Sequence, residues 1–381
     1  MRILFVTEEP IRFSGTMVRG GQIHVRNVVE GLRDRGHDVH LVDWNSDPDR
    51  PFQHSIDPRS RFIDGAARTF QQIVRVGRRF VPEVVVSKTR KVYVPALVAA
   101  RVLGIPHVVH VGSSPASSSD GFIDRLDAFS FGARLRAPHD AYFVVCGAIG
   151  DDLRSWEINP NKIFDVQNAV DTTRFVPNPE VNLSNSIRQK ISNANRPLLG
   201  FIGGITEYKG IFDLAAAIEQ TETNPTVAVV GSGPAREQFE IALGDRGLFL
   251  GSVDYKRMPA VYAAIDALVL PSHTEGLPRV ILEAGAAEKP VIATAVGAIP
   301  EVVSEEQTGL LCPPQSPSKL ATMIDRLLTG RRLTTLGRQA REVIVNEYTW
   351  SEQYDRYEMF LNKIVTNRHS IDRDRTNNMI E

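Results

Sequence analysis

Cysteine, net charge and long apolar runs are all scarce in this sequence. Its two cysteines, Cys146 and Cys312, lie far apart, which argues against a disulfide framework and fits a reducing compartment. The sequence has no Cys/His spacing typical of zinc sites, so we predict no bound metal. The formal net charge of -1 over 381 residues gives no indication of nucleic-acid binding.

Membrane-targeting features are also missing. The most apolar stretch, residues 92–109, contains Arg101 and Pro106 and is too polar for a membrane-spanning helix. The N-terminus runs directly into a predicted strand, without the apolar region and small-residue cleavage site of a signal peptide. We therefore expect a cytoplasmic protein whose membrane contact, if it has any, is peripheral.

Short β-branched runs alternate with longer amphipathic segments along the chain. This alternation predicts α/β domains with doubly wound parallel sheets, and 381 residues exceed the roughly 250–300 at which a single core stops growing. The predicted strands are 3–6, 39–42, 84–86, 107–111, 141–145 and 163–167, then 198–202, 226–230, 248–250, 267–270, 291–293 and 309–311. The predicted helices include 22–35, 94–103, 122–135, 148–156 and 211–220.

A polar, proline-containing stretch near residue 175 divides the two sets of strands. We expect an N-terminal Rossmann-like domain, 1–175, and a C-terminal one, 176–348, which face each other across a ligand-binding cleft. The final segment, 349–381, is predicted to form a helix that packs back on the N-terminal domain and frays at its end.

Two glutamates eight positions apart carry the strongest functional signal. Glu275 lies in a polar loop after an apolar run, whereas Glu283 lies in a segment made mostly of Val, Ile, Leu, Ala and Gly. A helix that is apolar nearly all round is buried, and a buried carboxylate needs a partner. Arg279, one turn earlier, is one candidate, and the hydroxyls of a ligand are the other.

Two glycine-containing loops before predicted helices are candidate anion sites. Gly20 and Gly21 would let an anion approach the backbone at a helix N-terminus, although an ordinary tight turn explains them equally well. Lys209 precedes the helix 211–220, where its charge opposes the helix dipole unless an anion is bound. A solvated surface lysine is the alternative.

Two further signals are weaker. Gly231-Ser232-Gly233 resembles half of a dinucleotide fingerprint, but Arg236 replaces the third glycine, which disfavours a nicotinamide cofactor and indicates at most a turn near a nucleotide. His110 ends the predicted strand 107–111 before a small polar loop, where it is placed to contact a ligand. A structural histidine is the alternative.

Together these residues resemble the retaining glycosyltransferases of family 4, which have the GT-B fold of two facing Rossmann-like domains. Glu275 and Glu283 match the family's Glu-x7-Glu motif, within Pro-Ser-x-x-Glu-Gly and ahead of Lys-Pro-Val-Ile-Ala-Thr. The resemblance covers nearly the whole chain. Its other parts are the segments 20–21, 35–39, 168–177, 201–203, 209–210, 231–234 and 250–253, together with His110.

The resemblance implies a metal-independent transfer of sugar from a nucleotide-sugar, with a UDP- or GDP-sugar expected as donor, no cofactor, and an undefined sugar, lipid-linked or small-molecule acceptor. Glu283 would bind the ribose hydroxyls, and the expected catalytic residues are His110 and Glu275 at the sugar and Lys209 at the diphosphate. The remaining expected donor contacts are Gly20, Gly21, Gly204, Gly231, Val253, Gly276 and Leu277.

One position departs from the family pattern. An arginine commonly precedes the lysine, in Gly-Arg-Leu, where this chain has Gly203-Gly204-Ile205. Either another basic residue such as Arg19 or Arg279 replaces that charge, or turnover is weak. A GT-B epimerase and a nucleotide-sugar-binding protein with little turnover are therefore the alternatives, whereas a glycogen-type phosphorylase would need a far longer chain.

The region 50–91 is strongly basic, with ten Lys or Arg residues against three acids. Apolar residues such as Phe70 and Phe80 are interleaved with them, a mixture that suits an anionic membrane surface. We therefore hypothesise peripheral contact with a membrane that carries the acceptor. A phosphorylated acceptor and a solvated helix face are the alternatives.

Overall fold

The computed structural model describes residues 1–13, 20–44, 50–56, 63–112, 132–179, 196–330 and 332–377. It divides into two compact units. The first unit consists of Met1–Gln167 with Ser351–Glu381, and the second of Asn168–Trp350. The chain thus passes from one unit to the other at 167/168 and returns at 350/351. The domain boundaries predicted from the sequence were 175/176 and 348/349.

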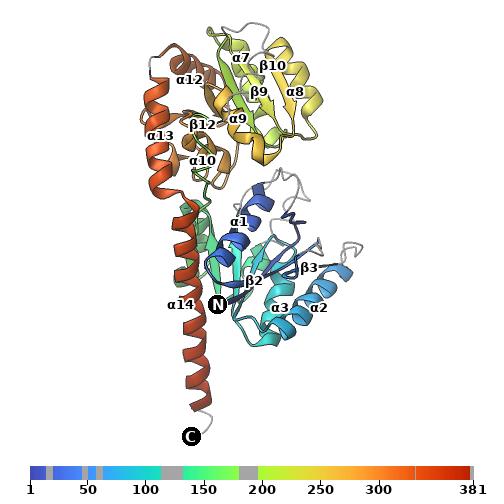
Figure 1. Ribbon diagram of the computed structural model, residues 1–381. Helices are drawn as coiled ribbons and strands as arrows, with labels where there is room; N and C mark the ends of the chain where they lie inside the picture. The colour runs from blue at the N-terminus through green and yellow to red at the C-terminus, as the bar shows by residue number, and fades with distance from the viewer. Residues whose placement is uncertain are drawn as a thin grey trace. The chain divides into compact units, whose positions relative to one another are not determined.

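The first unit is built on a seven-stranded sheet in the order β3-β2-β1-β4-β5-β6-β7 (Figure 1). All neighbouring strands are parallel. Most of these strands are nearly continuous runs of buried apolar residues, as expected for a sheet covered on both faces. The strands are β1 (Arg2–Thr7), β2 (Asp38–Asp43), β3 (Gln53–Ser55), β4 (Val84–Lys88), β5 (His107–Val111), β6 (Ala141–Val144) and β7 (Ile163–Asp165).

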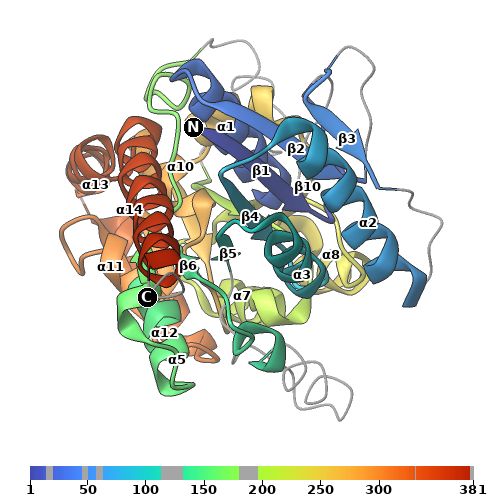
Figure 2. The same cartoon turned by 90° about the horizontal axis from the view of Figure 1, so that it is seen from below.

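Helices α1 (Gly20–Asp34), α2 (Ile63–Phe80), α3 (Tyr93–Leu103) and α5 (Gly147–Ser155) belong to the same unit. Figure 2 shows α2 and α3 lying side by side next to β2 and β4. Helix α3 is followed by Gly104, which adopts the left-handed conformation that favours glycine after a helix.

The long helix α14 (Trp350–Asn377) packs against elements from the beginning of the chain. The ring of Tyr357 lies 5.3 Å from that of Phe143 in β6. Arg35, just after α1, pairs with Asp355 at 2.6 Å and with Glu358 at 3.2 Å. Apolar packing and ion pairs together therefore hold this segment in the first unit.

The second unit is built on a six-stranded parallel sheet in the order β10-β9-β8-β11-β12-β13. Its core joins strands and helices through buried rings and aliphatic chains, among them Phe201, Phe239 and Ile324. The strands are β8 (Leu198–Ile202), β9 (Thr226–Val230), β10 (Gly247–Gly251), β11 (Ala267–Leu270), β12 (Val291–Thr294) and β13 (Gly309–Cys312). The helices are α7 (Ile211–Gln220), α8 (Arg236–Leu243), α9 (Met258–Ala264), α10 (Arg279–Ala286), α11 (Ile299–Val302), α12 (Pro317–Thr329) and α13 (Leu333–Glu347).

The predicted fold class, two Rossmann-like parallel-sheet domains, is confirmed. Every predicted strand is present within one or two residues, and α7 has the predicted bounds. The edge strand β3 was not predicted, because its three residues are Gln, His and Ser. The predicted helix 122–135 lies mostly outside the described residues. Among the helices described, none is both long and apolar enough to cross a membrane.

Candidate functional site

The loops that follow β8 and β11 meet where the strand order of the second sheet reverses. Strands β8 and β11 are neighbours, although the chain visits β9 and β10 between them. Open α/β sheets bind ligands beyond the carboxyl ends of their strands at such a switch point. The predicted residues Gly204 and Lys209 follow β8, and Glu275, Gly276 and Leu277 follow β11.

Two glycines allow the backbone segments of this region to approach one another. Gly210 has φ of 67°, and a side chain there would collide with the carbonyl oxygen of Pro271. Gly231, after β9, has φ of 139°, and a side chain there would collide with the carbonyl oxygen of Gly203. Both positions require glycine for conformation and for space, so the two glycines set the geometry of the loops even without a ligand.

Lys209 and Glu275 form an ion pair in this loop cluster. The Lys209 Nζ lies 2.6 Å from Glu275 Oε1, and the two side chains are 18% and 9% exposed. The Ser272 hydroxyl donates to the same carboxylate oxygen at 2.7 Å. The lysine is therefore held at the helix start by an acidic partner, which offsets its unfavourable position relative to the helix dipole.

The backbone around Gly276 presents unused donors. The carbonyl oxygen of Gly276 accepts from the amide of Ala298 at 3.0 Å, and that of Leu277 accepts from the Asn168 side chain at 2.6 Å. The amide N–H groups of Gly276 and Leu277 make no hydrogen bond to any part of the chain that the structure describes. Fixed amides beside a lysine are suited to an anion.

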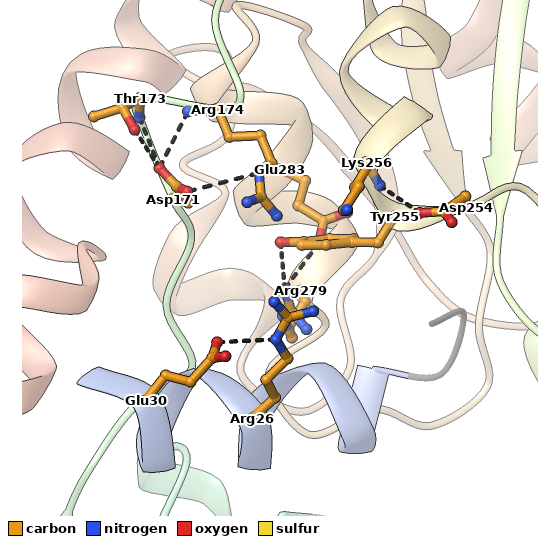
Figure 3. Close-up of polar contacts among 10 residues, drawn as sticks. All are labelled: Arg26, Glu30, Asp171, Thr173, Arg174, Asp254, Tyr255, Lys256, Arg279 and Glu283. Atoms are coloured by element: carbon orange, nitrogen blue, oxygen red, sulfur yellow. Dashed lines mark hydrogen bonds and ion pairs between the residues drawn. The ribbon is translucent and has the colours of Figure 1, made fainter. Parts of the chain in front are cut away.

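Glu283 is buried on α10 and has two protein partners, of which Figure 3 draws Arg279. Its Oε1 lies 3.2 Å from Arg279, and its Oε2 accepts from the Tyr262 hydroxyl at 2.8 Å. Burial raises the pKa of Glu283, while the Arg279 charge and the Tyr262 hydrogen bond act against this rise. Arg279 was foreseen as a partner from the sequence and Tyr262 was not.

Aromatic residues hold this buried ion pair in place. The Tyr255 hydroxyl accepts from Arg279 at 2.7 Å, an arrangement visible in Figure 3. The Phe175 ring packs 5.5 Å from the ring of Tyr255 and 5.6 Å from that of Tyr262. Phe175 and Asn168, which reaches Leu277, are the two ends of one sequence segment. That segment therefore supports both glutamate-bearing regions.

Two residues of the second unit that were predicted to contact the donor are not fully buried. Val253 follows β10 and is half-buried. Gly204 is exposed, and a side chain added there would meet no heavy atom within 4 Å. Gly204 thus has no packing role that would require glycine.

In the first unit, Gly20 and Gly21 open helix α1, and His110 lies in β5. A side chain on Gly21 would collide with the carboxylate of Glu9, the second of two glutamates that follow β1. The α1 N-terminus therefore has a carboxylate directly beside it, which the helix dipole favours. The contact between Glu9 and the start of α1 was not predicted from the sequence.

His110 is fully buried, and neither ring nitrogen has a hydrogen-bond partner among the described residues. Its ring packs 4.7 Å from that of His24 and 6.4 Å from that of Tyr357. Burial, assisted by the charge of Lys88, lowers the pKa of His110 well below its usual value. The imidazole is therefore neutral at physiological pH.

No group of three or more His, Cys, Asp or Glu side chains within the described residues is arranged to hold a metal ion.

Comparisons with known proteins identify the family of this chain. Residues 18–174 match the family described as "Glycosyltransferase Family 4", and residues 196–330 match "Glycosyl transferases group 1". The chain is a family 4 glycosyltransferase. It has the GT-B fold that the sequence led us to expect, and its transferase activity follows from the family.

Similar proteins support the assignment of this glycosyltransferase. The sulfoquinovosyl transferase SQD2 of Arabidopsis thaliana is 26% identical over 369 residues, covering 91% of this chain and 70% of the relative. The structure of a sucrose-phosphate synthase from Thermosynechococcus elongatus matches with a TM-score of 0.84 at 21% identity, and the match covers 96% of this chain and 100% of the synthase chain. HepE of Anabaena in complex with UDP-glucose matches with a TM-score of 0.79 at 18% identity, and the match covers 95% of this chain and 100% of the HepE chain.

Proposed function

We propose that this glycosyltransferase moves a sugar from a nucleotide-sugar donor with retention of anomeric configuration and without a metal ion. The observation that carries the proposal is the Lys209–Glu275 ion pair beside the unused amides of Gly276 and Leu277. A sugar diphosphate needs both kinds of group, cations or amides for its phosphates and a carboxylate for its hydroxyls. The complex of HepE with UDP-glucose adds support, because that protein shares the fold.

Donor binding would exchange the partners of this ion pair. The diphosphate would replace Glu275 as the partner of Lys209, and Glu275 would accept hydrogen bonds from the sugar. The lysine then faces the bond that breaks, where negative charge develops on the leaving diphosphate. Because the amides of Gly276 and Leu277 belong to fixed backbone, they would stabilise that charge with little reorganisation.

Glu283 would hold the ribose of the donor. A carboxylate on a buried helix has a fixed position, and the ribose 2′ and 3′ hydroxyls would donate to it. Tyr262 and Arg279 satisfy Glu283 in the free protein, so the ribose would add to or replace these contacts. Val253 and Gly231 are assigned to the neighbourhood of the base and phosphates, as the family resemblance implies.

No covalent enzyme nucleophile is required in this scheme. The acceptor would attack from the face that the diphosphate leaves, and the preorganised charge on Lys209 and the amides would stabilise the leaving group. From the first unit we assign the Gly21 amide to the diphosphate and His110 to the sugar. A buried imidazole without a described partner is a group that a ligand hydroxyl would satisfy.

We also propose peripheral contact with a membrane that carries the acceptor. Helix α3 exposes Val94, Val98 and Val102, which are 39%, 46% and 53% exposed and four residues apart on one helix face. Arg75 and Arg78 of α2 line a shallow hollow together with Val102. Apolar side chains bordered by arginines suit an anionic lipid surface.

The anomeric configuration of the product tests the retaining mechanism. A screen of UDP-, GDP- and ADP-sugars by thermal unfolding would first identify the donor, since a ligand at ~100 times its dissociation constant adds about 2.7 kcal/mol of stability. NMR of the product formed with that donor is then expected to show the donor's configuration, with turnover unchanged by a chelator. An inverted product or loss of turnover with the chelator would contradict the proposal.

The same assays separate the competing functions. A GT-B epimerase would convert the donor without any acceptor, and a binding protein would be stabilised by the donor without turnover. The open position of Gly204, where the family commonly has an arginine, is the feature that favours weak turnover. Sedimentation with vesicles of anionic lipid at low salt tests the membrane contact, and its absence would count against that contact.

A further inference from the structure

A cavity of about 530 Å³ in the first unit is lined by residues of α2, of β2 and of the edge strand β3. Pockets that bind small molecules commonly have volumes of roughly 300–1,000 Å³. The cavity therefore has room for a ligand the size of a small phosphate ester. Its lining residues are His40, Gln53, His54, Ser55, Gln72, Arg75, Val76, Arg79 and Phe80.

The described residues of the lining are cationic or uncharged and include no carboxylate. Arg75 and Arg79 are four residues apart on α2, so both lie on one face of that helix. Both are exposed, and neither forms an ion pair with any residue in the described ranges. Two guanidinium groups at one cavity without counter-charges favour an anionic ligand, and guanidinium binds phosphate in a two-pronged manner.

Two imidazoles form the opposite wall. The His40 Nδ1 lies 2.8 Å from the His54 Nε2, and the His40 ring stacks on Phe80 with 3.8 Å between ring centroids. When His40 donates in this bond, the proton of His54 is on Nδ1, where it can donate to an anion. A carboxylate oxygen of Asp38 lies 3.8 Å from the His40 Nε2 and 3.7 Å from Arg33.

This cavity is separate from the candidate site of the first unit. His40 pairs with Leu4 in β1, and β3 is the edge strand of the sheet. The switch point of this sheet lies instead between β1 and β4, beyond whose carboxyl ends ligands of such folds bind. The proposed transfer chemistry assigns no role to His40, His54, Arg75 or Arg79. Arg75 and Arg79 also line the hollow beside Val102 that we assign to membrane contact.

We propose that this cavity is a binding site for a phosphate group carried by a small ester. The arginines would hold the phosphate oxygens, and the histidine pair, Ser55 and Gln72 would supply further polar contacts. Such a phosphate occurs both in soluble phosphate esters and in the headgroup of a phospholipid. The chemistry is the same for the two sources, and they differ in whether the ligand is presented by a membrane.

Calorimetric titration of the full chain with glycerol 3-phosphate tests the site. We expect saturable binding to the wild type and a loss of affinity of about tenfold or more in Arg79→Gln and in Arg75→Gln, as for a charge-assisted hydrogen bond. Arg78→Gln is the matched control, because Arg78 is on the same helix, is exposed and does not line this cavity. It should change the affinity less than about twofold, a minor effect on this scale.

A second variant distinguishes a built site from general attraction to a basic helix. His54→Phe removes the imidazole and keeps all the arginines, and it is expected to weaken glycerol 3-phosphate binding severalfold. Unchanged thermal unfolding would show that each variant folds. Equal losses in Arg78→Gln and Arg79→Gln, full affinity in His54→Phe, or no binding to the wild type would overturn the proposal.

Vesicles then identify the source of the phosphate. Phosphatidylcholine vesicles with phosphatidic acid should compete with glycerol 3-phosphate when the natural ligand is a lipid headgroup, and Arg79→Gln should weaken the competition. A soluble ligand predicts no competition from either these vesicles or phosphatidylcholine alone. Both results support a phosphate site, whereas vesicle competition that Arg79→Gln leaves unchanged would contradict a shared site.

Discussion

The charged candidate residues of the second unit are paired with each other, whereas His110 of the first unit has no hydrogen-bond partner among the described residues. Lys209 has Glu275, and Glu283 has Arg279 and Tyr262. Ion pairs at this degree of burial require good geometry to offset desolvation. The second unit therefore has its charges fixed in place before any ligand arrives.

This difference indicates a division of labour in the proposed reaction. A preorganised charge can stabilise the leaving diphosphate strongly, whereas a neutral imidazole can contribute only a hydrogen bond. Substitutions in the second unit should accordingly have larger effects than those in the first.

The largest effect is expected for Lys209→Met, which keeps most of the aliphatic chain and removes the charge. Loss of one preorganised group at a developing negative charge lowers turnover about 100- to 1,000-fold, and we expect kcat to fall by that order. Steady-state kinetics with the identified donor would measure it. Lys319→Met, at an exposed position on α12, is the control and should leave kcat unchanged. A Lys209→Met variant with normal kcat would reject the role of Lys209.

Glu283→Gln should lower donor affinity about 10- to 100-fold, because a hydrogen bond to a charged group contributes about 1.5–3 kcal/mol. Calorimetry with the donor at neutral pH would measure the loss. Tyr262→Phe keeps the carboxylate and removes one of its partners, so its expected loss is smaller, roughly 2- to 10-fold. Equal affinities of wild type and Glu283→Gln would argue against ribose binding by Glu283.

The pH dependence of donor binding gives a second measure of Glu283. Its pKa is raised above the ordinary value of 4.5 by burial, so the carboxylate takes up a proton at a higher pH than an exposed glutamate does. Donor affinity should therefore decrease as the pH falls through that raised pKa. Glu283→Gln should lack this decrease, and a wild-type affinity that stayed constant to pH 4.5 would contradict the assignment.

In the first unit, His110→Phe should lower kcat only about 3- to 10-fold, the range of one neutral hydrogen bond. The fold should tolerate the change, since the ring loses no described bond and keeps its contacts with His24 and Tyr357. His107→Phe, in the same strand, is the contrasting variant. It removes two buried hydrogen bonds, to Ser87 at 2.8 Å and to His139 at 2.9 Å. It should lower stability and leave kcat per folded molecule unchanged.

His110 also predicts a stability effect of pH. Because its pKa in the folded protein lies well below 6.5, the unfolded chain takes up a proton that the folded protein does not. The free energy of unfolding should therefore decrease as the pH falls below about 6.5. Denaturant unfolding of wild type and His110→Phe would compare the slopes, and the variant should have the smaller one.

The sheets and the two glutamates could be predicted from the sequence because their signals are local. The predicted strand 84–86, for example, consists of three valines, and Glu283 differs from all its neighbours. Lys209 was predicted to face an anion, and its partner in the structure is Glu275, which lies 66 residues away. Pairing over such a separation depends on the sheet topology, which the local pattern does not encode.

The supporting residues could not be predicted for the same reason. Tyr262 lies on α9, 21 residues before Glu283, in a segment that reads as ordinary buried helix. His40 and His54 lie on neighbouring strands, yet β3 is too short and polar to predict. Contacts of this kind require the three-dimensional arrangement. The basic composition of 50–91 led only to the hypothesis of an anionic partner, which stays a prediction.

The smallest expected effect is a gain, for Gly204→Arg. The position is exposed, has room for a side chain and does not need a left-handed backbone, so the variant should fold with wild-type stability. An arginine here would add a second cation to Lys209 near the proposed diphosphate. We expect kcat to increase a few-fold, with a ceiling of about tenfold for one partly exposed charge-assisted bond. Gly204→Gln, of similar length and without charge, is the control.

The result decides whether the second unit already has enough positive charge to neutralise the diphosphate. An increase in Gly204→Arg but not in Gly204→Gln would mean that the wild type turns over slowly because a cation is missing. If both variants fold and kcat stays at the wild-type value, another basic residue already neutralises the diphosphate. Arg279 is engaged with Glu283 and Tyr255, so it could serve only by giving up these contacts when the donor binds. In that case Arg279→Lys, which loses the planar two-pronged geometry, should lower kcat in the Gly204 protein and less so in the Gly204→Arg protein.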